Sequence, residues 1–190
     1  MKEKMKIHEN AKLAFKGKMF EIYQWEQKLY DGSNQTFEMA KRSPTVQVIA
    51  VTGNKIALSK QEQPHKKHEF IALFGGKAEA GEKPLEAAKR ELEEESGLAS
   101  NDWELLKTFQ SHSKIEWEVC LYIARDCKKV TEPHLDPGEK IQTIEMTFEE
   151  FIDFITSEKY HWASFAREVF LMQKYGKLGG FKEKLFKGKI

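Results

Sequence analysis

Three glutamates stand in the sequence at a spacing that brings their side chains together on a helix. Glu91, Glu94 and Glu95 are related as i, i+3 and i+4, so at 3.6 residues per turn they fall within an arc of about 100°. Neighbouring carboxylates repel one another, and Glu95 lies near the expected C-terminal end, where the helix dipole disfavours negative charge. These repulsions destabilise the helix, which indicates that a cation from outside the chain binds the three carboxylates.

The expected cation is a hard divalent metal. Oxygens from carboxylates, waters and backbone carbonyls suit Mg²⁺ or Mn²⁺, and phosphate compounds usually arrive at enzymes with such ions. We expect Mg²⁺, with Mn²⁺ as the alternative. The competing interpretation is an ordinary solvated helix, which an isolated E-x-x-E-E pattern would favour, so the surrounding residues must decide.

Those surroundings predict how the glutamates are positioned. Pro84 suits the first position of a helix and Gly97 the left-handed residue that ends one, which predicts a helix from Pro84 to Ser96. Arg90 is spaced to pair with Glu82 or Glu94 and so to hold the ligands in place. An apolar stripe would anchor the helix on the core: Leu85, Ala88 and Leu92. Three glycines before the helix allow backbone atoms to approach a metal or phosphate closely: Gly75, Gly76 and Gly81.

The same stretch matches the whole Nudix box, which reads Gly, five residues, Glu, seven residues, Arg-Glu, an aliphatic, one residue, Glu-Glu, one residue, Gly, an aliphatic. The matching positions are Gly76, Glu82, Arg90, Glu91, Leu92, Glu94, Glu95, Gly97 and Leu98. At a usage of about 7% per residue type, the seven fixed positions match at random in roughly one of 10⁸ starting points. Chance is therefore a poor explanation, and the chain resembles the Nudix hydrolases.

This resemblance implies a fold, a reaction and a set of roles. The fold is α/β: a Nudix-type α/β/α sandwich with a mixed sheet, here with a small N-terminal antiparallel sheet. The reaction is attack by a metal-activated water on a phosphorus of a nucleoside diphosphate linked to another group. The implied metal ligands are Glu91, Glu94, Glu95 and the Gly76 carbonyl. Glu94, Glu95 and Arg90 are also expected among the catalytic residues, and Arg90 acts with Glu82 to support the loop.

The remaining elements follow from apolar patterning. Residues 15–37 alternate loosely and turn at Asp31-Gly32, which predicts two antiparallel strands. Further strands are expected at 46–52, 56–58, 70–74, 103–109, 117–124 and 141–146, and helices at 147–156 and 164–175. Strands dominate the first two thirds, which favours a mixed sandwich over a regularly alternating parallel sheet.

These elements divide the chain into three parts. Residues 1–42 hold N-terminal strands that could serve dimerisation, residues 43–176 form the Nudix domain, and residues 177–190 form a basic tail. We expect the tail to be solvated and partly frayed, with a phosphate or partner contact as the alternative.

A looser resemblance concerns the substrate. Residues 15–155 are similar to the ADP-ribose and nucleotide-sugar pyrophosphatase branch, at positions that include Asp31-Gly32, Phe37-Glu38, Arg42, Glu62-Gln63 and Leu121-Tyr122-Ile123-Ala124. In that branch the N-terminal sheet helps to form a homodimer and the nucleotide pocket. Tyr23 and Trp25 are therefore candidates for stacking on the base, or else pack within the sheet. Arg42 is a further candidate for binding the substrate.

Two departures from this branch bear on the site. The branch continues Glu-Gln with an aromatic residue and an arginine that touches the substrate, whereas this chain has Pro64-His65-Lys66-Lys67. Lys66 is our candidate for the altered phosphate contact. The general base that the branch carries after the box has no clear counterpart, and Glu116 is the candidate, with Glu118 or a box glutamate as alternatives.

Three functions remain open: an ADP-ribose or nucleotide-sugar pyrophosphatase, a hydrolase of dinucleotides, coenzyme A or nucleoside triphosphates, and a nucleotide sensor without activity. Composition narrows the setting. The chain has 31 basic and 30 acidic residues, which gives no global charge for nucleic acid or membrane binding. Without a signal-like start or a long apolar run, we expect a cytoplasmic protein. The two cysteines, Cys120 and Cys127, are expected to be buried or idle thiols.

Overall fold

A computed structural model describes residues 6–112 and 114–187 of the 190. The strands are β1 (Lys12–Lys16), β2 (Glu21–Lys28), β3 (Asn34–Lys41), β4 (Thr45–Thr52), β5 (Lys55–Glu62), β6 (Phe70–Ala72), β7 (Leu98–Ala99), β8 (Asp102–His112), β9 (Ile115–Arg125), β10 (Lys128–Lys129) and β11 (Lys140–Met146). The helices are α1 (Pro84–Ser96), α2 (Phe148–Ile155), α3 (Ala163–Lys174) and α4 (Leu178–Phe186).

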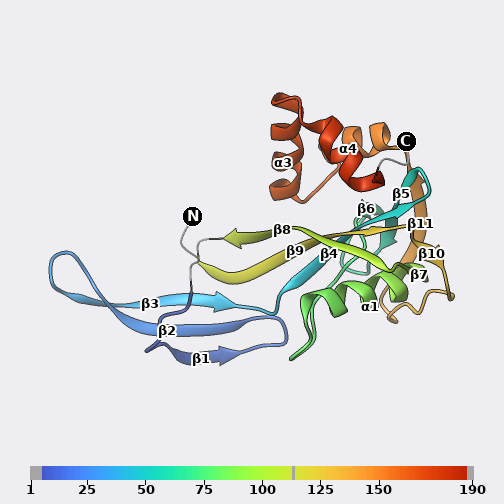
Figure 1. Cartoon of the computed structure of the whole chain (residues 1–190). Coiled ribbons are helices and arrows are strands. Elements are labelled where there is room, and N and C mark those ends of the chain that lie inside the picture. The colour runs from blue at the N-terminus through green and yellow to red at the C-terminus, as the bar shows by residue number, and fades with distance from the viewer. Residues whose placement is uncertain (1–5, 113, 188–190) are drawn as a thin grey trace.

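The main sheet is mixed. Its strands run in the order β1-β2-β3-β9-β4-β5-β11, with β6 added beside β5 and β8 beside β9. Strand β9 pairs in parallel with both β4 and β3, whereas β4 with β5 and β8 with β9 pair antiparallel. Helix α1 covers one face of the central strands and α3 and α4 lie over the other (Figure 1). This is the α/β/α sandwich that the sequence predicted, and a two-stranded β7–β10 ladder accompanies it.

Strand β4 shows why both faces are covered. Val46, Val48 and Ala50 are fully buried in the cluster that includes the helix α1 residue Leu92. The alternating residues Ile49 and Val51 are buried in the second cluster, with the apolar side chains of α2, α3 and α4. Successive side chains of a strand point to opposite faces, so a run of apolar residues with a helix on each side becomes the centre of two cores.

The N-terminal sheet has three strands where we predicted two. The turn at Asp31-Gly32 joins β2 to β3 as expected, and β1 adds a further strand to β2. These strands extend away from the central strands (Figure 1). A short parallel pairing of Ala40 and Lys41 with Ile115 and Glu116 joins them to β9.

The prediction of a solvated, frayed tail is wrong for residues 178–186. They form α4, in which Phe181, Leu185 and Phe186 are buried. Phe181 and Leu185 are one helical turn apart and so face the core together. The lysines among these residues and the Gly179-Gly180 pair, which is a poor helix former, hide this pattern in the sequence. Residues 188–190 lie outside the described residues.

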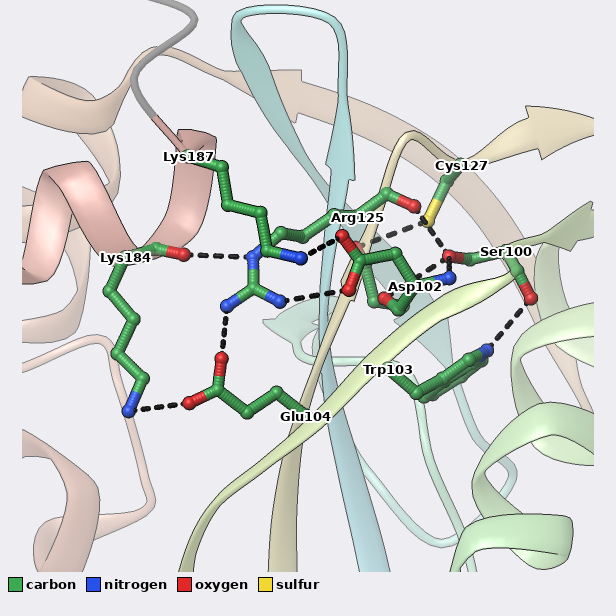
Figure 2. Close-up of polar contacts among 9 residues, drawn as sticks. Ser100, Asp102, Trp103, Glu104, Arg125, Cys127, Lys184 and Lys187 are labelled. Carbon is green, nitrogen blue, oxygen red and sulfur yellow. Dashed lines mark hydrogen bonds and ion pairs between the residues drawn. The ribbon is translucent and has the colours of Figure 1, made fainter.

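Arg125 at the end of β9 anchors α4 to the sheet (Figure 2). Its side chain is 4% exposed, and its Nε donates a hydrogen bond of 2.8 Å to the carbonyl of Lys184. The guanidinium also pairs with Asp102 and Glu104 of β8. Lys184 and Lys187 of the same helix end contact these two carboxylates in turn. The buried guanidinium of Arg125 thus donates to a carbonyl at the C-terminal end of α4 that has no partner within the helix, and the two carboxylates neutralise its charge.

Two smaller predictions can also be compared with the structure. Cys120 and Cys127 are buried free cysteines, and burial raises the pKa of the Cys127 thiol to about 12. None of the helices in the described ranges is long and apolar enough to cross a membrane.

Candidate active site

Helix α1 has the bounds that the sequence predicted, and its ends explain why. Pro84 occupies its first turn, and Gly97 caps its C-terminus in the left-handed conformation with φ 69°. A Cβ at Gly97 would lie 2.0 Å from the carbonyl oxygen of Thr131, so the cap requires glycine for space as well as for conformation. With Ala88 and Leu92 fully buried, the glutamates are turned toward the glycine-rich loop after β6.

Glu95 is the most enclosed of the three glutamates. It is 6% exposed, and its Oε2 accepts a hydrogen bond of 2.9 Å from the backbone N–H of Gly75. Burial raises the pKa of Glu95 to about 8, and the nearby carboxylates act in the same direction. A buried carboxylate with a single hydrogen bond is poorly compensated when it is ionised. Glu95 is therefore a strong acceptor for a cation.

Glu91 lies against Gly76 of the same loop. A Cβ at residue 76 would stand 2.4 Å from the Oε1 atom of Glu91, so glycine is required there for the carboxylate to reach the loop. Burial raises the pKa of Glu91, and the adjacent Arg90 opposes this shift. The Gly76 carbonyl accepts a hydrogen bond from Val46 N–H at 2.9 Å, which leaves it one lone pair for a further partner.

Arg90 binds both of the partners between which the sequence left a choice. Its Nε lies 3.0 Å from Glu82, and one terminal nitrogen lies 2.8 Å from Glu94 and 3.0 Å from Glu91. The other terminal nitrogen donates to the carbonyl of Lys77. Hydrogen bonding to Arg90 holds the pKa of Glu82 below its usual value, and the same bond raises the pKa of Arg90. The arginine thus ties the helix to the loop.

The carboxylate and carbonyl oxygens are of the type that a divalent ion prefers, but the carboxylates do not converge on one point. Within residues 6–112 and 114–187, no group of three His, Cys, Asp or Glu side chains is arranged to hold a metal. The Glu94 carboxylate accepts a hydrogen bond of 2.8 Å from Arg90 and is therefore engaged within the chain. The glutamates and the Gly76 carbonyl nevertheless offer only hard oxygen donors, and one guanidinium cannot neutralise them all.

A fourth acidic residue reaches this group, and no motif in the sequence pointed to it. Glu139 follows the Asp136-Pro137-Gly138 turn that leads into β11, and its charge acts on the pKa values of Glu91 and Glu95. Burial raises the pKa of Glu139 itself. The turn was visible in the sequence, but only the pairing of β11 with β5 brings it near α1.

Glu139 also lines a cleft of about 480 Å³ between two loops. One wall is the segment that follows β5, and the other is the turn before β11. The lining residues are Glu62, Gln63, Pro64, Lys66, Lys67, His68, Glu69, Pro137, Gly138, Glu139 and Lys140. The cleft therefore lies beside the acidic cluster and contains Lys66, one of the predicted substrate contacts. The Nζ of Lys66 stands 3.3 Å from the centre of the Phe70 ring.

The other predicted site residues lie on or beside the N-terminal sheet. Glu116 pairs with Lys41 at 3.5 Å and accepts a hydrogen bond from the backbone N–H of Ile7. Tyr23 donates its hydroxyl hydrogen bond to Glu21. Trp25 contacts the Phe37 ring. The roles of these side chains stay predictions.

Arg42 lies where the N-terminal strands meet β4. Its guanidinium carbon is 4.3 Å from the centre of the Trp117 ring and 5.5 Å from that of Phe20. A cavity of about 220 Å³ adjoins it. Burial lowers the pKa of Arg42, yet as a guanidinium it stays charged. Its binding role is also untested.

Comparison with known proteins agrees with this fold. The model of the NUDIX domain family matches residues 41–171. The chain belongs to that family.

Two curated relatives extend over most of the chain. The methanol dehydrogenase activator of Bacillus methanolicus is 30% identical over 150 residues, which are 77% of this chain and 81% of that protein. The ADP-ribose pyrophosphatase of Bacillus subtilis (strain 168) is 28% identical over 162 residues, which are 84% of this chain and 88% of that protein. With the intact acidic helix, these matches support a Nudix pyrophosphohydrolase.

A solved structure described as an ADP compounds hydrolase has the same fold. It matches with a TM-score of 0.72 over 96% of this chain and 95% of that chain, at 19% sequence identity. The fold that carries the acidic helix is therefore shared along nearly the whole length, including the N-terminal strands. Nudix hydrolases generally use divalent metal ions, and the carboxylates of α1 offer the oxygen donors that such ions bind.

Proposed function

We propose that the protein is a Mg²⁺-dependent hydrolase of the diphosphate bond in a nucleoside diphosphate linked to another group, with ADP-ribose or a nucleotide sugar as the substrate. The products are a nucleoside monophosphate and a sugar phosphate. The observation that carries this proposal is the enclosure of Glu91 and Glu95 against Gly75-Gly76, with negative charge in excess of the single arginine. The similarity to an ADP-ribose pyrophosphatase supports the choice of substrate.

Each residue has a defined part in this reaction. Mg²⁺, when bound, supplies charge neutralisation of the diphosphate and a lowered pKa of the attacking water. Glu91, Glu94, Glu95 and the Gly76 carbonyl would hold it. Arg90 positions Glu94 and Glu91 from the side, and its bond to Lys77 fixes the loop.

We assign the general base to Glu139 in preference to Glu116. The Glu139 carboxylate lines the cleft and is electrostatically coupled to the carboxylates of α1. The Glu116 carboxylate binds Lys41 and Ile7 N–H at the N-terminal sheet. A base must come within hydrogen-bond reach of the water whose proton it accepts, directly or through one further water. Glu139 meets this requirement better than Glu116, because it stands beside the carboxylates that would hold the metal.

Product analysis tests the function. The protein is incubated with Mg²⁺ and ADP-ribose, nucleotide sugars, dinucleotides, coenzyme A and nucleoside triphosphates, and products are identified by chromatography. AMP and ribose 5-phosphate from ADP-ribose, or the corresponding pair from a nucleotide sugar, are expected. Preferential cleavage of a dinucleotide, coenzyme A or a triphosphate would replace this substrate class with another. Binding of these compounds without any turnover would instead indicate a nucleotide sensor.

We also propose a homodimer formed through the N-terminal sheet. Leu13 and Phe15 of β1 and Met19 of the following turn are 49%, 62% and 55% exposed, and β1 is an edge strand. An apolar edge strand is a template for pairing with another chain. Light scattering should give twice the chain mass of 22.1 kDa. Phe15→Lys should reduce it to one chain, and a wild-type monomer at micromolar concentration would refute the dimer.

A further inference from the structure

The cleft beside the acidic helix has a cationic wall that the proposed chemistry does not use. The loop between β5 and β6 places Lys66, Lys67 and His68 in succession along it. On the opposite wall, Glu139 connects the cleft electrostatically to Glu91 and Glu95 of α1. Lys66, Lys67 and His68 face this cleft, and the proposed chemistry gives no reason for three basic residues there.

Most charges around this wall are already paired. Glu62 lies 3.2 Å from Lys140, and Glu69 lies 2.7 Å from Lys60. Lys66 is held over the Phe70 ring. These contacts neutralise the two acidic residues of the loop and hold Lys66 against the cleft wall.

Lys67 and His68 are different. In the part of the chain that the structure describes, neither has an ion-pair or hydrogen-bond partner, and both are exposed to the cleft. The Lys67 ammonium offers three donors, and a histidine ring offers an N–H in either protonation state. Adjacent donors with no acidic partner are suited to bind the oxygens of an anion, and a phosphate accepts several such bonds at once.

We propose that Lys67 and His68 form a subsite for a phosphate at the far end of the substrate, on the group joined to the nucleoside diphosphate. The preferred substrate is then a nucleoside diphosphate whose second group bears its own phosphate, rather than one that ends in an uncharged sugar. This inference rests on the proposed function, because it takes the acidic helix as the place where the diphosphate is held.

A matched pair of compounds tests the subsite. ADP-ribose and ADP-ribose 1″-phosphate differ only in the terminal phosphate. The wild-type protein should show a kcat/KM about tenfold or more higher for the phosphorylated compound, the size of one charge-assisted hydrogen bond. Lys67→Ala and His68→Ala should each remove most of this preference and change kcat/KM for ADP-ribose less than threefold, and Lys67→Arg should retain it.

The chain offers controls for both side chains. His65 belongs to the same loop and is exposed, but it does not line the cleft, so His65→Ala should leave the preference intact. Lys128→Ala removes an exposed lysine on β10. If these controls reduce the preference as much as the cleft variants do, the effect is one of general charge and the subsite is refuted.

Binding separates failure of the subsite from failure of the proposed function. Calorimetry with the Glu94→Gln variant gives Kd for both compounds without relying on turnover. A tighter Kd for the phosphorylated compound, lost in the Lys67→Ala background, supports the subsite even if the wild-type protein hydrolyses neither compound, and in that case only the proposed function falls. Equal Kd values for the two compounds refute the subsite, whichever of them is hydrolysed.

Discussion

Two arginines in this protein sit among carboxylates, and the two groups differ in their balance of charge. The Arg90 cluster comprises Arg90, Glu82, Glu91 and Glu94. The Arg125 cluster comprises Arg125, Asp102, Glu104, Lys184 and Lys187. The first has three carboxylates for one cation, with Glu95 and Glu139 nearby. The second has three cations for two carboxylates and is closed by the carbonyl of Lys184.

The difference indicates which cluster is built for a ligand. The Arg125 cluster is satisfied within the chain, and its effect is to hold α4 against β8 and β9 (Figure 2). Burial and the neighbouring carboxylates raise the pKa of Glu91 in the Arg90 cluster and of Glu95 beside it, and the single guanidinium does not offset this shift. A surplus of buried charge costs stability and is retained where a ligand offsets it.

The largest expected effect is the loss of turnover when the surplus charge is reduced. Glu95→Gln keeps the shape of the side chain and removes a charged ligand of the Mg²⁺ that would neutralise the diphosphate, so kcat should fall by about 10³-fold. Steady-state assays with Mg²⁺ measure it. Glu93→Gln is the matched control, because Glu93 is exposed on the same helix, and it should retain activity. Equal losses in both variants would contradict the role of Glu95.

The choice of base gives the next largest effect. Glu139→Gln should lower kcat by about 10²-fold or more, in the range of general base catalysis. Glu116→Gln removes a charge paired with Lys41 and should change kcat less than threefold. Both rates are measured at saturating substrate, and circular dichroism confirms that each variant is folded. If Glu116→Gln lowers kcat more than Glu139→Gln does, Glu116 is the general base.

The Arg125 cluster should respond in stability instead of activity. Arg125→Met removes a buried cation and should cost about 3 kcal/mol, because Asp102 and Glu104 lose a hydrogen-bonded partner and α4 loses its anchor. Urea denaturation measures the free energy of unfolding, and turnover per folded molecule should stay within twofold of wild type. Arg167→Met, at a side chain 72% exposed, is the control and should change stability by less than about 0.5 kcal/mol. Normal stability in Arg125→Met would show that α4 is held by its apolar face alone.

The last expected effect is a pH dependence of stability in the metal-free protein. The pKa of Glu95 is raised from 4.5 to about 8, so its contribution to stability is fully present below about pH 4.5. That contribution is lost as the pH rises from about 4.5 through 8, by at most about 1.4 kcal/mol per pH unit. Glu95→Gln cannot ionise, so its advantage in Tm over wild type should grow from pH 5 to pH 8 and shrink when Mg²⁺ is added. A constant difference in Tm across this range would show that Glu95 ionises without penalty.

The sequence was most informative where one local pattern determines the structure. Pro84 and Gly97 predicted the ends of α1, and the helix expected at 147–156 begins at the Thr147–Glu150 capping box of α2. Apolar patterning predicted the strand at 46–52, and its alternate side chains enter the two cores. In each case the signal and its consequence lie within a few residues of each other, so no knowledge of the tertiary structure was needed.

Other features depended on contacts between distant residues. Glu139 approaches α1 only because β11 pairs with β5. The helix α4 forms from a segment with two glycines and several lysines because Phe181 and Leu185 find a core and Arg125 finds the carbonyl of Lys184. Such tertiary contacts override local propensity, and the sequence of the tail does not show which residues it will contact.

Metal binding by the folded protein tests the central claim most directly. Electron paramagnetic resonance of Mn²⁺ titrated into the metal-free protein counts bound ions without any substrate. We predict stoichiometric binding that Mg²⁺ displaces, that persists in Glu93→Gln, and that weakens at least tenfold in Glu95→Gln. Unchanged Mn²⁺ binding in a Glu91→Gln, Glu94→Gln, Glu95→Gln triple variant, or no binding by the wild-type protein with and without nucleotide, would contradict the account.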